Sequence, residues 1–317
     1  MTIFHLLLSL ALLALGGEIL VRGASSVAKR LGMSPLLIGL TLVGFGTSTP
    51  ELVSSVGAAL SGSPGIAVGN VVGSNIANLL LVLGVTAAIC PIPVSSRILE
   101  QDVRILIAVT AIFSFGVMVL PLGRLFGFAL VAGLVWYVWN AWRSESNHAA
   151  PSTPSSAHAP GTAPADLFAS IWPALALAAA GIGAVVVGGN LLVESASALA
   201  RSWGVSDTVI GLTVVAVGTS LPEFVTSLVA AYRRQPDIAL GNVLGSGVYN
   251  ILGIAGLTGI ISPVEVPADI IWGHGLAMLA ATLVTGIFLK HDATLTRREG
   301  ALLAFLYALY LIASVPR

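Results

Sequence analysis

A short polar motif that contains a proline and a glutamate occurs twice in this apolar chain. The first copy is GTSTPE at residues 46–51, and the second is GTSLPE at residues 218–223. A charge at the centre of a bilayer costs about 2.5–3.5 kcal/mol on insertion scales, so acids in apolar segments are functional candidates. Proline removes a backbone donor and clashes with the preceding turn, so it kinks or breaks a helix. A breaker and an acid repeated in both halves of a chain are typical of an ion site at the middle of a membrane.

The two motifs supply oxygen ligands of three kinds. Glu51 and Glu223 carry carboxylates, and the helix breaks free backbone carbonyls that in a membrane must meet protein, water or an ion. Such oxygens suit hard cations such as Ca²⁺ and Na⁺, whereas zinc would favour His or Cys, and neither occurs in these motifs. Hydroxyl oxygens lie about one turn from the acids, on Thr47, Ser48, Thr219 and Ser220.

A polar stripe follows each motif. The segments GNVVGSNIAN at residues 69–78 and GNVLGSGVYN at residues 241–250 space Asn, Ser and Asn by four, which places them on one face of a helix. We expect these stripes to complete the ion site; the alternative is that they only join helices by hydrogen bonds. Because each stripe recurs beside a carboxylate motif, ion binding is favoured. The stripes are Asn70, Ser74 and Asn78 in the first half and Asn242, Ser246 and Asn250 in the second.

The composition places these motifs in a membrane protein. Of the 317 residues, 56% are hydrophobic and only 9% are charged, against about 25% charged in soluble domains. The zero net charge gives no electrostatic footprint for nucleic acid. The single cysteine, Cys90, cannot form an internal disulfide. Residues 1–5 carry no Lys or Arg, so the first apolar segment is interpreted as a membrane span rather than a signal peptide.

Ten apolar segments approach the roughly 20 residues that a membrane span requires. Five precede and five follow residues 143–166, a Pro-, Ser- and Ala-rich stretch that we interpret as a flexible cytoplasmic linker. The sequence therefore predicts an all-α integral membrane protein. The predicted spans lie near residues 3–27, 35–60, 66–89, 101–120, 124–142, 167–200, 207–231, 238–261, 268–289 and 299–315.

The basic residues orient these spans. With the N-terminus outside, ten of the fourteen Lys and Arg residues fall in cytoplasmic loops and three fall outside. Cytoplasmic loops of membrane proteins carry an excess of Lys and Arg. We therefore expect both termini outside, in a multi-pass protein of the cell's inner (plasma) membrane.

The two halves of the chain are copies. An offset of 172 residues carries Glu51 to Glu223 and Asn78 to Asn250 without a gap. Because each half holds five predicted spans, the second copy enters the membrane the opposite way round, an arrangement typical of alternating-access transporters. We expect a first repeat at residues 1–142 and an inverted second repeat at residues 167–317. Since both copies lie in one chain, a monomer is the expected functional unit.

Two further acids lie within apolar segments. Glu18 and Arg22 are spaced i,i+4 on one helix and can pair locally, so we interpret Glu18 as structural. Glu194 lies near the external end of its span, and we expect it at the membrane interface.

These residues resemble the cation/Ca²⁺ exchanger superfamily, and within it the prokaryotic Na⁺/Ca²⁺ exchangers. Residues 46–51 with 69–78, and 218–223 with 241–250, look like the two α-repeats of that family. The resemblance implies four cation sites between two pairs of broken helices, with the first and sixth spans sliding across them. It also implies no cofactor other than the transported ions Ca²⁺ and Na⁺.

By motif position, the resemblance also assigns roles within the site. Glu51 and Glu223 would be shared central ligands, and Asn78 and Asn250 would border the middle site. Thr47 and Thr219 would contribute backbone carbonyls, while Ser48, Ser220, Ser74 and Ser246 would serve the outlying Na⁺ sites.

The sequence leaves two alternatives for the counter-ion, Na⁺ and H⁺. Many Na⁺-coupled relatives carry Asp where this chain has Asn250, which bears on stoichiometry and K⁺ dependence. H⁺-coupled relatives carry an acid where this chain has Gly73 and Gly245, which favours Na⁺. The sequence thus predicts an electrogenic Na⁺/Ca²⁺ antiporter; a Ca²⁺/H⁺ antiporter is the alternative. Protons should compete at two neighbouring buried carboxylates in either case.

Two other classes of function have less support. A channel usually builds its filter from oligomeric rings, whereas this chain pairs two copies of its own motif. An intramembrane enzyme is not expected, because no nucleophile and base are paired near the motifs.

Overall fold

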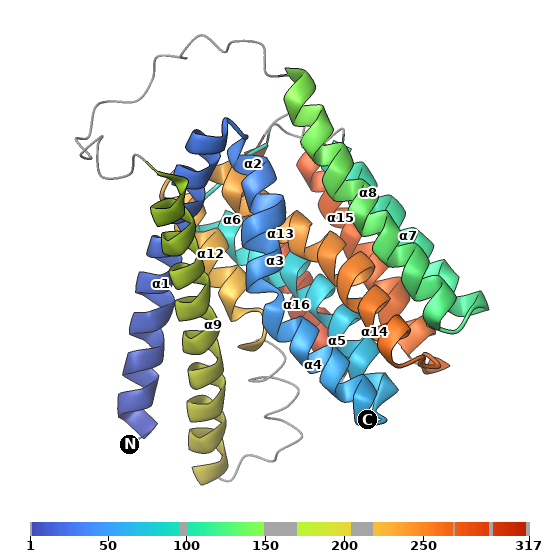
Figure 1. Ribbon diagram of the computed structural model, residues 1–317. Helices are drawn as coiled ribbons and strands as arrows, with labels where there is room; N and C mark the ends of the chain where they lie inside the picture. Colours follow the sequence, from blue (N-terminus) through green and yellow to red (C-terminus); the bar gives the residue numbers. More distant parts are fainter. Residues whose placement is uncertain are drawn as a thin grey trace.

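The computed structural model describes residues 2–94, 101–148, 170–203, 218–268, 270–291 and 294–314. Within these ranges the chain is helical, apart from two strands of two residues each (Figure 1). The α-helices are α1 (Thr2–Leu31), α2 (Pro35–Ile38), α3 (Gly44–Thr47), α4 (Thr49–Leu60), α5 (Pro64–Ile76), α6 (Leu83–Ile89), α7 (Val103–Val119), α8 (Arg124–His148), α9 (Ile171–Ser202), α12 (Leu221–Tyr232), α13 (Pro236–Val248), α14 (Gly256–Ile261), α15 (Leu276–His291) and α16 (Arg297–Ser314). Wider π-helical turns are η1 (Gly39–Val43), η2 (Ala77–Val82), η5 (Tyr249–Ala255) and η6 (Ile270–Gly275), and the strands are β1 (Ile92–Pro93) and β2 (Thr294–Leu295).

Six helical stretches in the described residues are long and apolar enough to cross a membrane, or seven if the bent pair 35–47 and 49–60 is one span. The chain is therefore a multi-pass membrane protein. Two predicted spans are short helices here: α7 has 17 residues, and α12 has 12. Residues 207–217 of the predicted seventh span lie outside the described residues.

The first six residues of the stretch predicted as a linker are helical. Helix α8 continues through His148, six residues beyond the predicted end of its span. No proline follows Arg124 until Pro151, so nothing in residues 143–148 breaks the helix. Residues 149–166 lie outside the described part of the chain.

The predicted helix break is present in the first motif. Helices α3 and α4 meet at Ser48, whose φ of −82° and ψ of 8° leave the α region, and the axis bends by 45°. Pro50 lies in the first turn of α4, where its missing N–H removes no helical hydrogen bond. In the second motif Ser220 has φ −87° and ψ 7°, and α12 begins at the next residue. Each proline thus starts a new helix.

A second irregularity was not predicted. The polar stripes enter η2 and η5, π-helical turns that begin at equivalent positions, Ala77 and Tyr249. A π-helical turn holds one extra residue and occurs often at functional sites. Asn78 and Asn250 are the second residues of these turns, so the end of each polar stripe lies in irregular helix.

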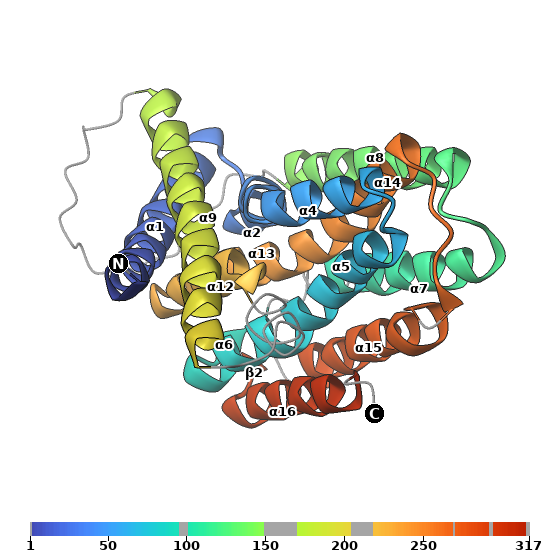
Figure 2. The same cartoon turned by 90° about the horizontal axis from the view of Figure 1, so that it is seen from below.

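The helices form two packed groups. Figure 2 shows α1 and α9 together at the left and the other helices packed beside them, with α4, α5 and α13 between α8 at the top and α15 and α16 at the bottom. Helices α1 and α9 pack closely along their length because small residues meet there: a Cβ at Gly181 would lie 2.4 Å from Leu20 N. Much of their buried apolar surface forms a cluster separate from the main core.

Contacts between the two halves come in equivalent pairs. Helix α16 packs on α6, and α8 packs on α14, which is the same contact with the halves exchanged. Strands β1 and β2 pair antiparallel, and Leu122 pairs with Val264 at the equivalent place in the other half. The short strands satisfy backbone groups where the helices end. Each half therefore completes its packing with the last helix of the other.

Candidate cation site

Both predicted acids are fully buried where the two halves meet. Glu51 lies in the first turn of α4 and Glu223 in the first turn of α12, each with 0% of its surface exposed. The breaks at Ser48 and Ser220 create these first turns in the interior of the molecule. Because Glu51 and Glu223 are not paired with Lys or Arg in any contact between described residues, the acids need a cation or a proton.

An asparagine fixes the backbone beside each acid in the same way. Asn70 Nδ2 donates to Glu51 O at 3.1 Å and to Ser55 Oγ at 2.9 Å. Asn242 Nδ2 donates to Glu223 O at 3.1 Å and to Ser227 Oγ at 2.9 Å. The first asparagine of each stripe therefore has a structural role and holds a broken helix onto the next helix.

Further hydrogen bonds join the two halves across the site. Ser48 Oγ donates to Glu223 Oε1 at 2.9 Å, and Thr47 Oγ1 donates to Asn242 Oδ1 at 3.1 Å. Each joins a group of the first motif to a group of the second half. Two more contacts are Ser246 Oγ to Gly44 O at 3.3 Å and Asn250 Nδ2 to Ser74 Oγ at 3.1 Å.

Several buried polar atoms of the site have no hydrogen-bond partner among the described residues. A buried polar group without a partner is destabilising, and native proteins contain few of them. Most of those here are oxygens, and carboxylate, amide and hydroxyl oxygens are the ligands of hard cations. The unpartnered atoms are both carboxylate oxygens of Glu51, Oε2 of Glu223, both amide atoms of Asn78, Oδ1 of Asn250 and Oγ of Ser220.

The chemistry of this atom set fits an alkali or alkaline-earth cation. The described residues hold no cluster of three or more His, Cys, Asp and Glu side chains. With two carboxylates, a bound cation must complete its coordination with neutral oxygens from hydroxyls, amides and backbone, which the site offers. The two carboxylates would balance one Ca²⁺ or two Na⁺.

Comparison with known proteins identifies the family. Residues 1–143 and 173–315 match the family described as sodium/calcium exchanger protein, which covers most of the chain. The chain belongs to this family. It is similar to CaxA of Alkalimonas amylolytica, with 36% identity over 99% of this chain and 98% of that protein. It is also similar to the sodium/calcium exchanger MaX1 of Methanosarcina acetivorans, with 34% identity over 97% of this chain and 96% of that protein.

The fold matches a solved exchanger over the whole chain. The sodium-calcium exchanger NCX_Mj, in a crystal soaked with Na⁺ and Ca²⁺, superposes with a TM-score of 0.83 at 29% identity. The match covers 100% of this chain and 99% of that one. The resemblance to prokaryotic Na⁺/Ca²⁺ exchangers drawn from the motifs is thus confirmed.

The structure brings nine of the ten predicted site residues into the interior of this exchanger-family chain. The exception is Thr219, which is half-buried and makes no hydrogen bond in the described structure. The buried residues are Thr47, Ser48, Glu51, Ser74, Asn78, Ser220, Glu223, Ser246 and Asn250.

Two serines were missed by the sequence analysis. Ser55 and Ser227 are fully buried and accept the hydrogen bonds of Asn70 and Asn242. They lie one turn beyond the glutamates, and the 172-residue offset carries one to the other. The presence of serine at equivalent positions in both halves could have indicated this role from the sequence. Thr226 is also buried there, with its hydroxyl unpartnered among described residues.

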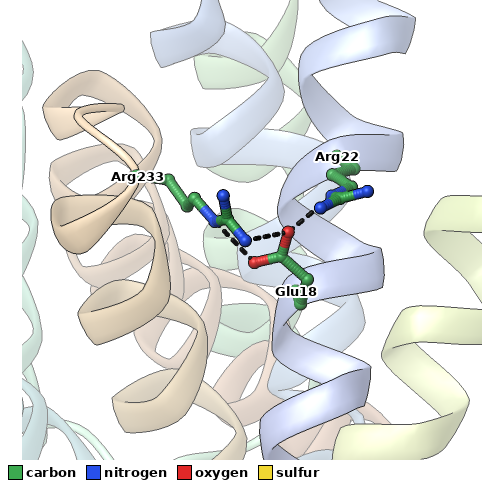
Figure 3. Close-up of polar contacts among 3 residues, drawn as sticks. All are labelled: Glu18, Arg22 and Arg233. Carbon is green, nitrogen blue, oxygen red and sulfur yellow. Dashed lines mark hydrogen bonds and ion pairs between the residues drawn. The ribbon is translucent and has the colours of Figure 1, made fainter. Parts of the chain in front are cut away.

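The other two acids lie apart from the site. Glu18 accepts from Arg22 Nε at 2.5 Å on its own helix, which agrees with the local pair predicted (Figure 3). Arg233, directly after α12, also contacts Glu18, which the sequence did not predict. Glu194 is exposed on α9.

Proposed function

We propose that this chain is an antiporter that exchanges Na⁺ for Ca²⁺ by alternating access. One observation carries the proposal: two fully buried carboxylates, one from each half, lie among buried hydroxyl and amide oxygens that lack protein partners. The similarity to the sodium/calcium exchangers MaX1 and NCX_Mj supports the choice of ions.

In this proposal the carboxylates are shared between the ions. Glu51 and Glu223 bind Ca²⁺ together, with carbonyl oxygens from Thr47 and Thr219. Na⁺ uses the same carboxylates with outlying hydroxyl ligands, so Na⁺ and Ca²⁺ exclude each other. A site that must be filled before it can move gives exchange rather than leak. The outlying ligands are Ser48, Ser74, Ser220 and Ser246, and Asn78 and Asn250 border the middle site.

The same proposal includes ten membrane spans in two inverted repeats, residues 1–142 and 167–317, with a cytoplasmic linker at 143–166. The exchanged contacts of α16 on α6 and α8 on α14 support the pairing of repeats. The distribution of Lys and Arg supports termini outside the inner (plasma) membrane. The functional unit is one chain, and exchange of about three Na⁺ for one Ca²⁺ would be electrogenic, as the family resemblance implies.

A Ca²⁺/H⁺ antiporter of the same fold is the second candidate. The absence of an acid at position 245 has a packing reason, since a Cβ there would lie 2.4 Å from Leu40 O. Glycine at position 245 is therefore weaker evidence for Na⁺ over H⁺ than the sequence suggested. Protonation of Glu51 and Glu223 could itself drive the exchange, so the counter-ion needs a direct measurement.

Reconstituted vesicles separate the two candidates. Purified protein in liposomes is loaded with Na⁺, and uptake of ⁴⁵Ca²⁺ is followed after dilution into Na⁺-free buffer at equal pH on both sides. We expect uptake that depends on the Na⁺ gradient and is accelerated when valinomycin and K⁺ compensate charge. Uptake driven by a pH gradient and indifferent to Na⁺ would replace the proposal with the proton-coupled one.

A matched control tests the site itself. Glu51→Gln and Glu223→Gln should stop uptake, while Glu194→Gln should leave it unchanged because Glu194 is exposed on α9. Equal uptake in all three variants would refute the role of the buried acids. Insertion of each variant is checked by its yield in the membrane fraction.

A further inference from the structure

An ion-pair cluster connects α1 to α12, outside the cation site. Arg233, directly after α12, contacts both carboxylate oxygens of Glu18: Nη2 lies 2.6 Å from Oε1 and Nε lies 2.7 Å from Oε2 (Figure 3). Paired contacts of one guanidinium with one carboxylate are stronger and more directional than a single contact. Arg22 also binds Glu18, but it lies on α1 itself and cannot hold α1 against another helix.

Helices α1 and α9 both pack on α12 but not comparably on its counterpart α4. Helix α1 packs along α12, whereas the equivalent contact in the other half, α9 on α4, is not made to a comparable extent among the described helices. Gly17 of α1 faces α12, since a Cβ there would lie 2.9 Å from Val225 Cγ1. Its counterpart Gly189 of α9 also faces α12, at Pro222. Under the alternating access of the proposed function, this structure represents one of two positions of the α1–α9 pair.

The repeat predicts which contact the other position would make. The 172-residue offset carries Glu18 to Asn190, and it carries Ser61 to Arg233. With the halves exchanged, Asn190 would approach Ser61, and these neutral side chains cannot form an ion pair. Both are exposed in this structure. The Glu18–Arg233 pair thus has no equivalent in the opposite position.

We propose that Glu18 and Arg233 form a one-sided latch that stabilises the access state in which α1 and α9 cover α12. This rests on the alternating access of the proposed function. An interaction shifts a two-state equilibrium only if it differs between the states, and this one does. In the proposed orientation Arg233 is cytoplasmic, so the latch would hold the cytoplasmic side closed and favour access from outside.

The expected effect is modest because the pair is partly solvated. The side chain of Arg233 is 48% exposed and that of Glu18 is 22% exposed. Exposed pairs are screened by solvent and salt, so breaking the latch should change the ratio of the two states by about two- to fivefold. The change should shrink at high salt.

Distances between spin labels test the latch without measuring transport. Cys90 is replaced by Ser, and labels are attached at Leu31→Cys on α1 and Ile89→Cys on α6, which are 49% and 50% exposed. Double electron–electron resonance of the full chain in lipid nanodiscs, without Na⁺ or Ca²⁺, then gives the populations of the two positions of α1. Glu18→Gln and Arg233→Gln should each raise the second population, and together they should do no more than either alone.

Matched variants separate the latch from a general loss of charge. Arg234→Gln removes the same charge one residue away and should change nothing, since no contact between Arg234 and Glu18 occurs in the structure. Arg22→Gln should have little effect, and Arg233→Lys, which lacks the planar fork, should be intermediate. Identical populations in Arg233→Gln and Arg234→Gln, or additive effects of Glu18→Gln and Arg233→Gln, would overturn the latch. The distance measurement is made without Na⁺ or Ca²⁺, so its outcome does not depend on which counter-ion the protein transports. A different counter-ion would therefore refute the proposed function without affecting the test of the latch.

Discussion

The two halves of the site have nearly the same sequence and the same local hydrogen bonds, but they do not make the same contacts with each other. Asn70 and Asn242 bind the backbone beside their glutamates at the same distances, 3.1 Å in each half. Ser48 also binds Glu223, whereas no partner of Ser220 Oγ or of the Glu51 carboxylate lies among the described residues. Contacts within a repeat thus follow from its sequence. Contacts between repeats depend on how the two halves are positioned relative to each other in this conformation.

We expect the largest effect, a loss of cation affinity, when a carboxylate is removed from either half. A buried charge that loses its partner is typically destabilised by about 3–5 kcal/mol, which corresponds to a roughly 100-fold or greater fall in cation affinity. We expect Glu51→Gln and Glu223→Gln to be equally severe, because a shared cation needs both. Ca²⁺ binding measured by isothermal titration calorimetry checks this. If only one variant lost binding, the two halves would have separate sites.

The second comparison concerns the asparagines that hold the broken helices. Asn242 makes three polar contacts and is buried, whereas Asn70 makes two and is half-buried. Buried groups left unpaired cost about 1–3 kcal/mol each, so Asn242→Ala should lower the free energy of unfolding by more than Asn70→Ala. Denaturant unfolding in detergent measures both. Equal losses would show that the Thr47 contact with Asn242 adds no stability.

The third comparison concerns a substitution that adds a negative charge to the polar stripe of the second half only. The amide nitrogen of Asn250 is held by Ser74, so its oxygen is the atom left for a cation. Asn250→Asp should therefore raise Ca²⁺ affinity, by roughly tenfold, since carboxylate count tunes divalent affinity, and it should change the number of Na⁺ ions exchanged. Ca²⁺ binding with Na⁺ competition measures the change, and Asn190→Asp, on exposed α9, is the control. Unchanged ion dependence would place position 250 outside the site.

We expect the smallest effect, a change in thermal stability, from substitutions just after α4 and α12. Gly62 after α4 and Arg234 after α12 are equivalent residues with φ of +72° and +58°. A left-handed conformation costs a residue with a Cβ about 1–2 kcal/mol, so Gly62→Ala should lower the unfolding midpoint and Arg234→Gly should raise it. Thermal unfolding in detergent measures both shifts. Shifts of the same sign would show that backbone conformation is not what distinguishes these positions.

Much of the site was predictable because its chemistry is local. The spacing of Pro50 and Glu51 in an apolar segment predicted a helix break beside a buried acid, and the structure has that break at Ser48. The π-helical turns at Asn78 and Asn250 were not predictable from spacing by four, because they depend on packing against neighbouring helices. Arg233 lies beyond the predicted span at residues 207–231, and only the tertiary structure reveals its contact with Glu18 on α1.

The sequence by itself determined that the chain lies in a membrane, that it is built from two copies, and that each copy contributes an acid, hydroxyls and an amide stripe. These follow from composition and from the cost of burying polar groups in lipid, which act on each segment separately. Only the tertiary structure decided which groups meet across the halves and that α1 and α9 pack on α12 rather than on α4. Those contacts join residues up to 215 positions apart, and they can differ between two arrangements of the same sequence.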